Sequence, residues 1–349
     1  MKKTLIALSL LAATTIIASA QVKPGATVAD VANYTGADRM QKIIAGAKQE
    51  GSVSVYTSLQ TADIGKLGAA FEKKYGVKVI PWRSGSEAIV NRTIQEARAN
   101  RFTVDVIETN GPELESIHRE NLLQAIKSPY LADLIAPAIL PHGEWMGTRL
   151  NVFVQAYNTR QIKKQDLPKT WEELANPKWK GKIGIEQEDS DWLAGTFSDL
   201  GDARARKVFG DIVKTNGMSV RKGHTLLAQL VVSGEVPLAL TVYNYKAEQL
   251  KNQRAPIDWY VIPPAIARAN GVAVAARAPH PNAALLWYEF EIGEEGQQLL
   301  LTRDFVPTNR AIETPLNRFP LRFVDAKAVL DDAEKWDRRF AEIFGPQPR

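Results

Sequence analysis

The chain has 349 residues, with 44 Lys and Arg against 39 Asp and Glu, and it contains no cysteine. A chain of this length has room for about two domains. Acidic and basic residues are mixed along the whole sequence, which argues against a nucleic-acid-binding protein with its clustered basic face. The lack of cysteine excludes disulfides and lipid attachment through a thioether.

The first residues have the three-part layout of a secretory signal peptide. Two lysines are followed by an apolar run over residues 5–17 and by the small-residue triplet Ala18-Ser19-Ala20. The apolar run is shorter than a bilayer-spanning helix needs. The sequence therefore predicts a signal peptide over residues 1–20, export of the protein, and no membrane insertion after cleavage.

Three strand-like runs, each followed by an amphipathic stretch, come next in the chain. Residues 52–58 read as a strand and residues 61–76 as a helix that ends at a glycine. Residues 77–86 give a strand and a loop, and residues 87–100 a second helix. Residues 104–123 repeat the pattern. This alternation predicts an α/β protein with a mostly parallel sheet.

The loops that follow these three strands carry small and polar side chains. In an open α/β sheet such loops bind ligands, because the helix N-termini behind them offer unpaired amides and a positive dipole. Helix capping is the alternative explanation for each serine and threonine. The candidate ligand-binding residues in these loops are Tyr56, Thr57, Ser58, Arg83, Ser84, Ser86, Thr109 and Asn110.

The middle of the chain reads as a second α/β lobe inserted into the first. A long strand-like segment over residues 145–162 leads into it. A helical run over residues 203–215, a helix over 226–234 and a strand-like run over 236–245 follow. Residues 257–301 then supply two strand-like runs and a helix that return to the first lobe.

This order predicts two lobes with two crossovers between them. The predicted organisation is residues 21–152 for the first part of lobe 1, residues 153–264 for lobe 2, and residues 265–349 for the second part of lobe 1 together with C-terminal helices.

Several motifs resemble the extracellular solute-binding proteins of ABC importers, and specifically the branch with the ferric-ion-binding proteins. They are "VYTSL", "AFEKKYGVKV", "LPKTWEELANPKWKGKIGI", "GEVPLALTVYNY", "HPNAALLWYEFEIGEEGQQLL" and "FVPTNR". The resemblance implies a type II periplasmic binding protein fold, with two lobes joined by a two-strand hinge that close on a small ligand. It also implies a periplasmic location, a membrane permease as partner, no nucleic-acid partner and no cofactor. We expect a monomer.

The resemblance also suggests ferric iron as the transported ligand. In the ferric-binding relatives, adjacent tyrosines after a "GEV" turn bind Fe(III), and a first-lobe histidine often assists. Here Tyr243 and Tyr245 are separated by Asn244, and Tyr56 and Gln60 stand in the loop where the histidine is expected. Fe(III) prefers anionic oxygen donors such as phenolate. Tyr243, Tyr245 and Tyr56 are therefore the candidate metal ligands and Asn244 a candidate ligand-binding residue, with core packing as the alternative.

A small anion or zwitterion is the alternative ligand. Arg83 and its neighbouring serines could bind a phosphonate, phosphate or carboxylate through charge-assisted hydrogen bonds. The acidic run at 186–191 could bind an ammonium group, although a solvated surface explains it equally well. The remaining candidate ligand-binding residues are Glu186, Asp189, Asp191, Trp192, His224 and Thr225.

A secreted enzyme is a further alternative. The sequence contains no GxSxG motif, no HExxH motif and no cysteine nucleophile. We therefore expect a binding protein that performs no chemistry on its ligand.

Overall fold

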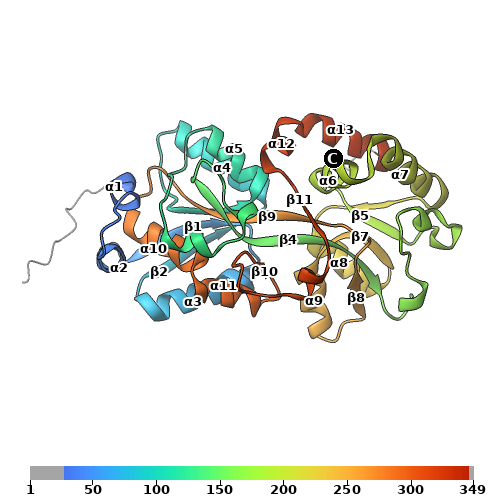
Figure 1. The fold of residues 1–349 in the computed structure, drawn as a ribbon, viewed down its shortest axis with the longest axis horizontal. Helices are drawn as coiled ribbons and strands as arrows, with labels where there is room; N and C mark the ends of the chain where they lie inside the picture. Colours follow the sequence, from blue (N-terminus) through green and yellow to red (C-terminus); the bar gives the residue numbers. More distant parts are fainter. Residues whose placement is uncertain (1–26, 346–349) are drawn as a thin grey trace, which may run out of the picture.

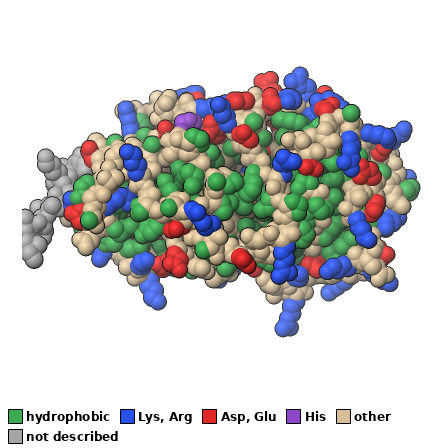
Figure 2. Space-filling view, viewed as in Figure 1, with side chains coloured by type: hydrophobic (Ala, Val, Ile, Leu, Met, Phe, Trp, Pro, Cys, Tyr) green, Lys and Arg blue, Asp and Glu red, His purple; other side chains and the backbone are tan. Residues whose placement is uncertain are grey.

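The computed structural model describes residues 27–345, which form two lobes connected by long strands (Figure 1). The predicted signal peptide, residues 1–20, lies outside the described residues. Within residues 27–345, none of the helices has both the length and the apolar character that crossing a membrane requires. Basic and acidic side chains are interspersed on the face shown in Figure 2, as the mixed sequence predicts.

The first lobe is built on three parallel strands, as the sequence predicts. Their order in the sheet is β2-β1-β3, and β9 continues the sheet antiparallel to β3. A helix follows each of the three parallel strands, so the loops at their carboxyl ends meet at one edge. The bounds are β1 Ser52–Thr57, α3 Thr61–Tyr75, β2 Lys78–Arg83, α4 Ser86–Arg98, β3 Val106–Asn110, α5 Gly111–Arg119 and β9 Ala265–Val274.

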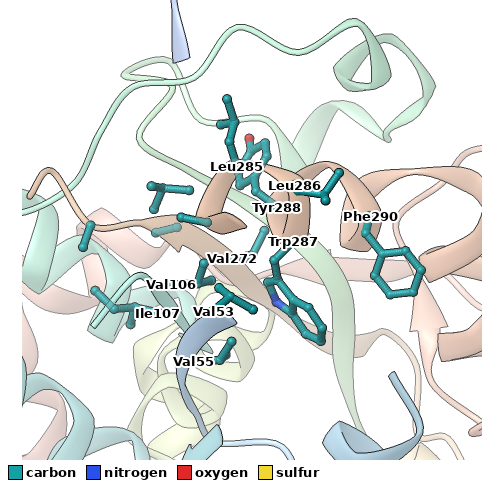
Figure 3. Packing of buried hydrophobic residues seen from close by; sticks show 14 of the residues in the cluster. Val53, Val55, Val106, Ile107, Val272, Leu285, Leu286, Trp287, Tyr288 and Phe290 are labelled. Atoms are coloured by element: carbon teal, nitrogen blue, oxygen red, sulfur yellow. The ribbon is translucent and has the colours of Figure 1, made fainter. Parts of the chain in front are cut away.

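The core of the first lobe forms around a helix that is buried along its whole length. This helix, α10, spans Pro281–Ile292. Its Trp287 lies beside Val53 and Val55 of β1 (Figure 3) and packs edge-on against Phe71 of α3 with ring centroids 5.1 Å apart. Burial of such large side chains contributes roughly 1.5–3 kcal/mol each. The other helices of this lobe are α1 Val28–Ala32, α2 Arg39–Glu50 and α11 Glu294–Leu301.

The second lobe repeats the layered arrangement with a smaller sheet. Strands β7, β5 and β6 are parallel, and β4 lies antiparallel to β7. The C-terminal helix α13, Ala333–Phe344, packs on this lobe through Phe340 and Phe344. The bounds are β5 Ile183–Glu186, α6 Ser190–Leu200, α7 Asp202–Asn216, β6 Ser219–Arg221, α8 His224–Ser233, β7 Leu238–Tyr243, α9 Asn244–Asn252 and β8 Ile257–Tyr260.

Two antiparallel strands, β4 and β9, run from one lobe into the other and form the hinge (Figure 1). Strand β4, Trp145–Asn158, has 14 residues and is buried throughout. Its first half pairs with β9 in the first lobe, and its second half pairs with β7 and β8 in the second. The C-terminal segment adds β10 Val306–Pro307, β11 Leu321–Phe323 and α12 Ala326–Asp331, and β10 and β11 pair with β4 and β9.

The hinge strands pack so closely at Gly271 of β9 that there is no room for a larger side chain. A Cβ atom there would lie 2.4 Å from the Met146 carbonyl oxygen and 2.9 Å from the Trp145 ring. We expect Gly271→Ala to lower the free energy of unfolding by about 2 kcal/mol or more, because the backbone of β4 must move. Urea unfolding measures this. As the control, Gly65→Ala in α3 meets nothing within 4 Å and should raise stability by about 0.5–1 kcal/mol. A loss below about 0.5 kcal/mol in Gly271→Ala would contradict this description of the hinge.

Candidate functional site

A cleft of about 1150 Å³ lies between the lobes. The loops after β1, β2 and β3 form its first-lobe wall. The end of β5, the start of α8 and the end of β7 form its second-lobe wall, and β4 and β9 form its floor. Most of the residues predicted from the sequence lie in the lining, namely Ser58, Arg83, Ser84, Ser86, Asn110, Glu186, Asp189, His224, Thr225, Tyr243 and Tyr245.

Tyr56 and Thr57 do not reach this cleft. The Tyr56 hydroxyl donates to Glu96 at 2.8 Å and lies 3.0 Å from the Thr103 hydroxyl, and burial raises its pKa. The Thr57 hydroxyl donates to Glu108 at 2.9 Å. Both side chains therefore belong to the interior of the first lobe, because their part of β1 is buried on both faces.

The remaining predicted residues also lie behind the lining. Thr109 is fully buried in β3, and Asn244 is the buried first residue of α9. Trp192 packs against Trp171 and Phe209 in the core of the second lobe. Asp191 lies one layer below the cleft surface, where it pairs with an arginine that does line the cleft.

The two tyrosines of "VYNY" are neighbours in the cleft, but only Tyr243 belongs to a strand. Strand β7 ends at Tyr243 and α9 begins at Asn244, so the expectation of an extended run to residue 245 is wrong. Their rings stack with centroids 5.8 Å apart. The Tyr243 ring lies 3.7 Å from that of His224, and its hydroxyl accepts a hydrogen bond from Arg268. Burial raises the pKa of Tyr245 to about 12, so its phenol is protonated in the ligand-free protein.

Two arginines of the cleft floor are held by buried ion pairs. Arg149 of β4 contacts Glu108 of β3 at 2.5 Å, and Arg268 of β9 contacts Asp191 of α6 at 2.6 Å. Neither arginine is among the residues that the sequence predicts for the site, because both lie inside strands and the predicted site residues lie mainly in loops. A basic residue within an otherwise apolar strand is the sequence signal that could have indicated these two arginines as site residues.

Carboxylates on opposite walls of the cleft have oxygens without a hydrogen-bond partner. Glu113 Oε2, from α5 of the first lobe, and Asp189 Oδ2, just before α6 of the second lobe, are both buried and unpaired within residues 27–345. Burial raises the pKa of Glu113, while Arg268 opposes that shift. An unpaired buried acceptor costs about 1–3 kcal/mol, and more when it is charged. A cation in the cleft would remove this cost.

Glu186, Asp189 and His224 form a compact cluster on the second-lobe wall. One potential ligand atom from each lies within 4.8 Å of the others. His224 Nε2 is 3.1 Å from Asp189 Oδ1, and Nδ1 is 3.0 Å from the Thr241 carbonyl oxygen. Burial, together with the charge of Asp189, raises the pKa of Glu186 to about 7. The cluster has the donor types that metal ions bind.

The first-lobe wall around Arg83 is basic, in contrast to the acidic cluster on the second-lobe wall. Arg83 is exposed and donates one long hydrogen bond, of 3.4 Å, to the Leu59 carbonyl. Ser84 lies beside it, and Ser86 begins α4. The Asn110 amide donates to the Ser86 hydroxyl at 2.9 Å. This corner can receive an anion through the guanidinium and the N-terminus of α4.

The sequence profile of a family described as bacterial extracellular solute-binding proteins matches residues 66–316. The chain belongs to this family. Among curated relatives, the Fe(3+)-binding periplasmic protein of Serratia marcescens is 25% identical over 286 residues, which cover 78% of this chain and 83% of the relative. Iron uptake protein A1 of Synechocystis sp. is 24% identical and covers 76% of this chain and 79% of its own length.

Solved structures share the fold of this solute-binding protein. Iron-bound HitA from Pseudomonas aeruginosa superposes with a TM-score of 0.72 at 21% identity, covering 83% of this chain and 99% of HitA. The periplasmic binding protein AfuA from Actinobacillus pleuropneumoniae, with exogenous fructose-6-phosphate bound, superposes with a TM-score of 0.74 at 21% identity, covering 85% of this chain and all of AfuA. The fold is thus that of the periplasmic binding proteins, as the sequence predicts.

The buried carboxylate of Glu113, whose Oε2 has no partner within residues 27–345, should make the ligand-free solute-binding protein less stable at high pH. Because its pKa is raised in the folded state, the wild type loses stability as pH rises through the interval between the unfolded and folded pKa values. Glu113→Gln cannot ionise, so we expect it to raise the free energy of unfolding at pH 8 and to change it much less at pH 4.

Urea unfolding of the ligand-free protein at both pH values measures this difference. Glu87→Gln, at an exposed residue of the same wall, is the matched control and should have little effect at either pH. A gain for Glu113→Gln that is equal at pH 4 and pH 8 would contradict the proposed cost of the buried charge.

Proposed function

We propose that the protein is the periplasmic receptor of an ABC importer, which captures ferric iron in the cleft between its lobes and delivers it to the membrane permease. One observation supports a cationic ligand above the others. Glu113 and Asp189, on opposite walls, each present a buried carboxylate oxygen that has no hydrogen-bond partner within residues 27–345. The curated relatives whose names specify ferric iron or iron uptake support the same ligand.

The charge balance of the cleft favours a cation. Arg149, Arg268 and Lys222 are already neutralised by ion pairs with carboxylates. Asp189 is paired with His224, but Glu113 and Glu186 form no ion pair within residues 27–345 and outnumber Arg83, which forms none there either. Hard cations prefer carboxylate oxygen to softer donors, so this excess of negative charge suits Fe(III).

Capture requires only binding and hinge motion. When a ligand bridges the two walls, small backbone changes in β4 and β9 bring the lobes together. The closed form, which buries the ligand, is the state that docks on the permease. No step changes the ligand chemically, the protein needs no cofactor, and a monomer is sufficient.

A small anion or zwitterion is the second candidate ligand, because Arg83 and the N-terminus of α4 form an anion-binding corner. The phosphate sugar in the AfuA structure shows that this fold can hold a phosphorylated ligand. A zwitterion would place its anionic group at Arg83 and its ammonium group at Asp189.

Thermal unfolding separates the two ligands. Fe(III), supplied as its nitrilotriacetate complex at about a hundred times Kd, should stabilise the protein by about 2.7 kcal/mol and raise Tm by about 5 °C. Arg83→Ala should keep this shift, because Arg83 does not contact the cation. The ferric proposal would be contradicted if Fe(III) left Tm unchanged while a phosphonate that carries an amino group raised it. Loss of that phosphonate-induced rise in Arg83→Ala would favour the second ligand.

A further inference from the structure

We infer that the captured cation is bound by Glu186, Asp189 and His224 of the second lobe, and that Tyr243 and Tyr245 are walls of the site and do not bind the metal. This inference rests on the proposed function, because it specifies how the same cleft holds its cation. It assigns the cargo to the transition-metal cations that accept carboxylate oxygen together with imidazole nitrogen.

The spacing of the three side chains fits one metal ion. Their potential ligand atoms lie within 4.8 Å of one another. Ligands at about 2.0–2.2 Å from a metal are at most about 4.4 Å apart, so the three atoms lie close to the separations of one coordination sphere and must draw closer together around the ion. All three residues belong to the same lobe.

His224 directs its Nε2 toward the carboxylates of the cluster, with Asp189 Oδ1 at 3.1 Å. Nδ1 lies 3.0 Å from the carbonyl oxygen of Thr241, which can only accept, so Nδ1 carries the proton and donates it. A ligating histidine usually donates its other ring N–H in this way to a carbonyl or carboxylate. A metal ion bound between Nε2 and the Asp189 carboxylate would replace this direct contact.

The two carboxylates are arranged as ligands of one ion. Asp189 is 1% exposed and lines the cleft, and its Oδ2 has no hydrogen-bond partner within the described part of the chain. Glu186 is fixed at the end of β5, because its oxygens accept the Gly223 N–H at 2.7 Å and the Glu188 N–H at 2.6 Å. Each of these oxygens keeps a second lone pair for a metal.

Tyr243 and Tyr245 form hydrogen bonds and ring contacts with protein residues instead of binding the metal. The Tyr243 oxygen accepts a hydrogen bond from the guanidinium of Arg268, which a metal at that oxygen would have to displace. Its ring lies against His224 and forms one side of the cluster. The Tyr245 ring packs on Phe305 with centroids 4.3 Å apart, on the first-lobe side. Both rings thus shape the site and exclude water.

Binding and visible absorption of the ferric protein test this assignment together. Fe(III) is presented as its nitrilotriacetate complex to the mature chain, and Kd is measured by competition with that chelator. We expect Asp189→Asn and His224→Gln to weaken binding at least ten-fold, and Tyr245→Phe to change Kd less than about two-fold. The wild-type ferric complex should lack the visible charge-transfer band that phenolate ligands produce.

Two controls separate misfolding from lost ligation. Melting of each ligand-free variant shows whether it folds, and if Asp189→Asn does not, His224→Gln tests the same set from a partly exposed position. X-ray absorption of the wild-type ferric complex should show scattering from an imidazole ligand, and this signal should be lost in His224→Gln. If His224 had a purely structural role, the scattering would be the same in both proteins.

The possible failures are distinguishable. A visible band that disappears in Tyr245→Phe, or unchanged Kd in both Asp189→Asn and His224→Gln, would overturn this ligand set and leave ferric capture standing. A wild-type protein that binds no Fe(III) would overturn the proposed ferric function and this inference together.

Discussion

The architecture depends on the two buried ion pairs that anchor the crossover strands. Arg149 of β4 is neutralised by Glu108 of the first lobe, and Arg268 of β9 is neutralised by Asp191 of the second. Each crossover strand is thus tied to a different lobe at the floor of the cleft. Breaking such a pair leaves a buried charge without compensation, at a cost of about 3–5 kcal/mol.

This arrangement also decides which charges face the ligand. The two floor arginines, Arg149 and Arg268, are neutralised by carboxylates beneath the lining, so they present little free positive charge to the cleft. The wall carboxylates Glu113 and Asp189 belong to different lobes, and each keeps one oxygen without a partner in the described part of the chain. A cation bound by the second-lobe cluster attracts the Glu113 carboxylate of the first-lobe wall and so favours the closed state over the open one, and this differential affinity is what shifts the equilibrium between the two. The ligand-free protein carries the cost of these charges, and the ligand removes it.

Much of the fold follows from sequence periodicity, and part of the site does as well. Loops after parallel strands meet at one edge, so the order of strands and helices alone places Arg83, Ser84 and Asn110 in a cleft. Tyr56 could not be excluded, because β1 is buried on both faces and alternation does not show which side chain reaches the ligand. The strand-like run expected over residues 236–245 extends two residues too far, because α9 begins at Asn244 without a glycine or proline to mark the change. Arg268 was missed because its partner, Asp191, is distant in sequence and only tertiary packing brings the two together.

Anomalous X-ray diffraction from crystals of the ferric-loaded protein tests the central claim most directly, because it locates the metal without reference to any variant. A metal bound between the lobes by the second-lobe cluster predicts an iron peak about 2.0–2.2 Å from the carboxylate oxygens of Glu186 and Asp189 and from Nε2 of His224. An iron peak at the phenol oxygens of Tyr243 and Tyr245, with the carboxylates beyond coordination distance, would contradict it.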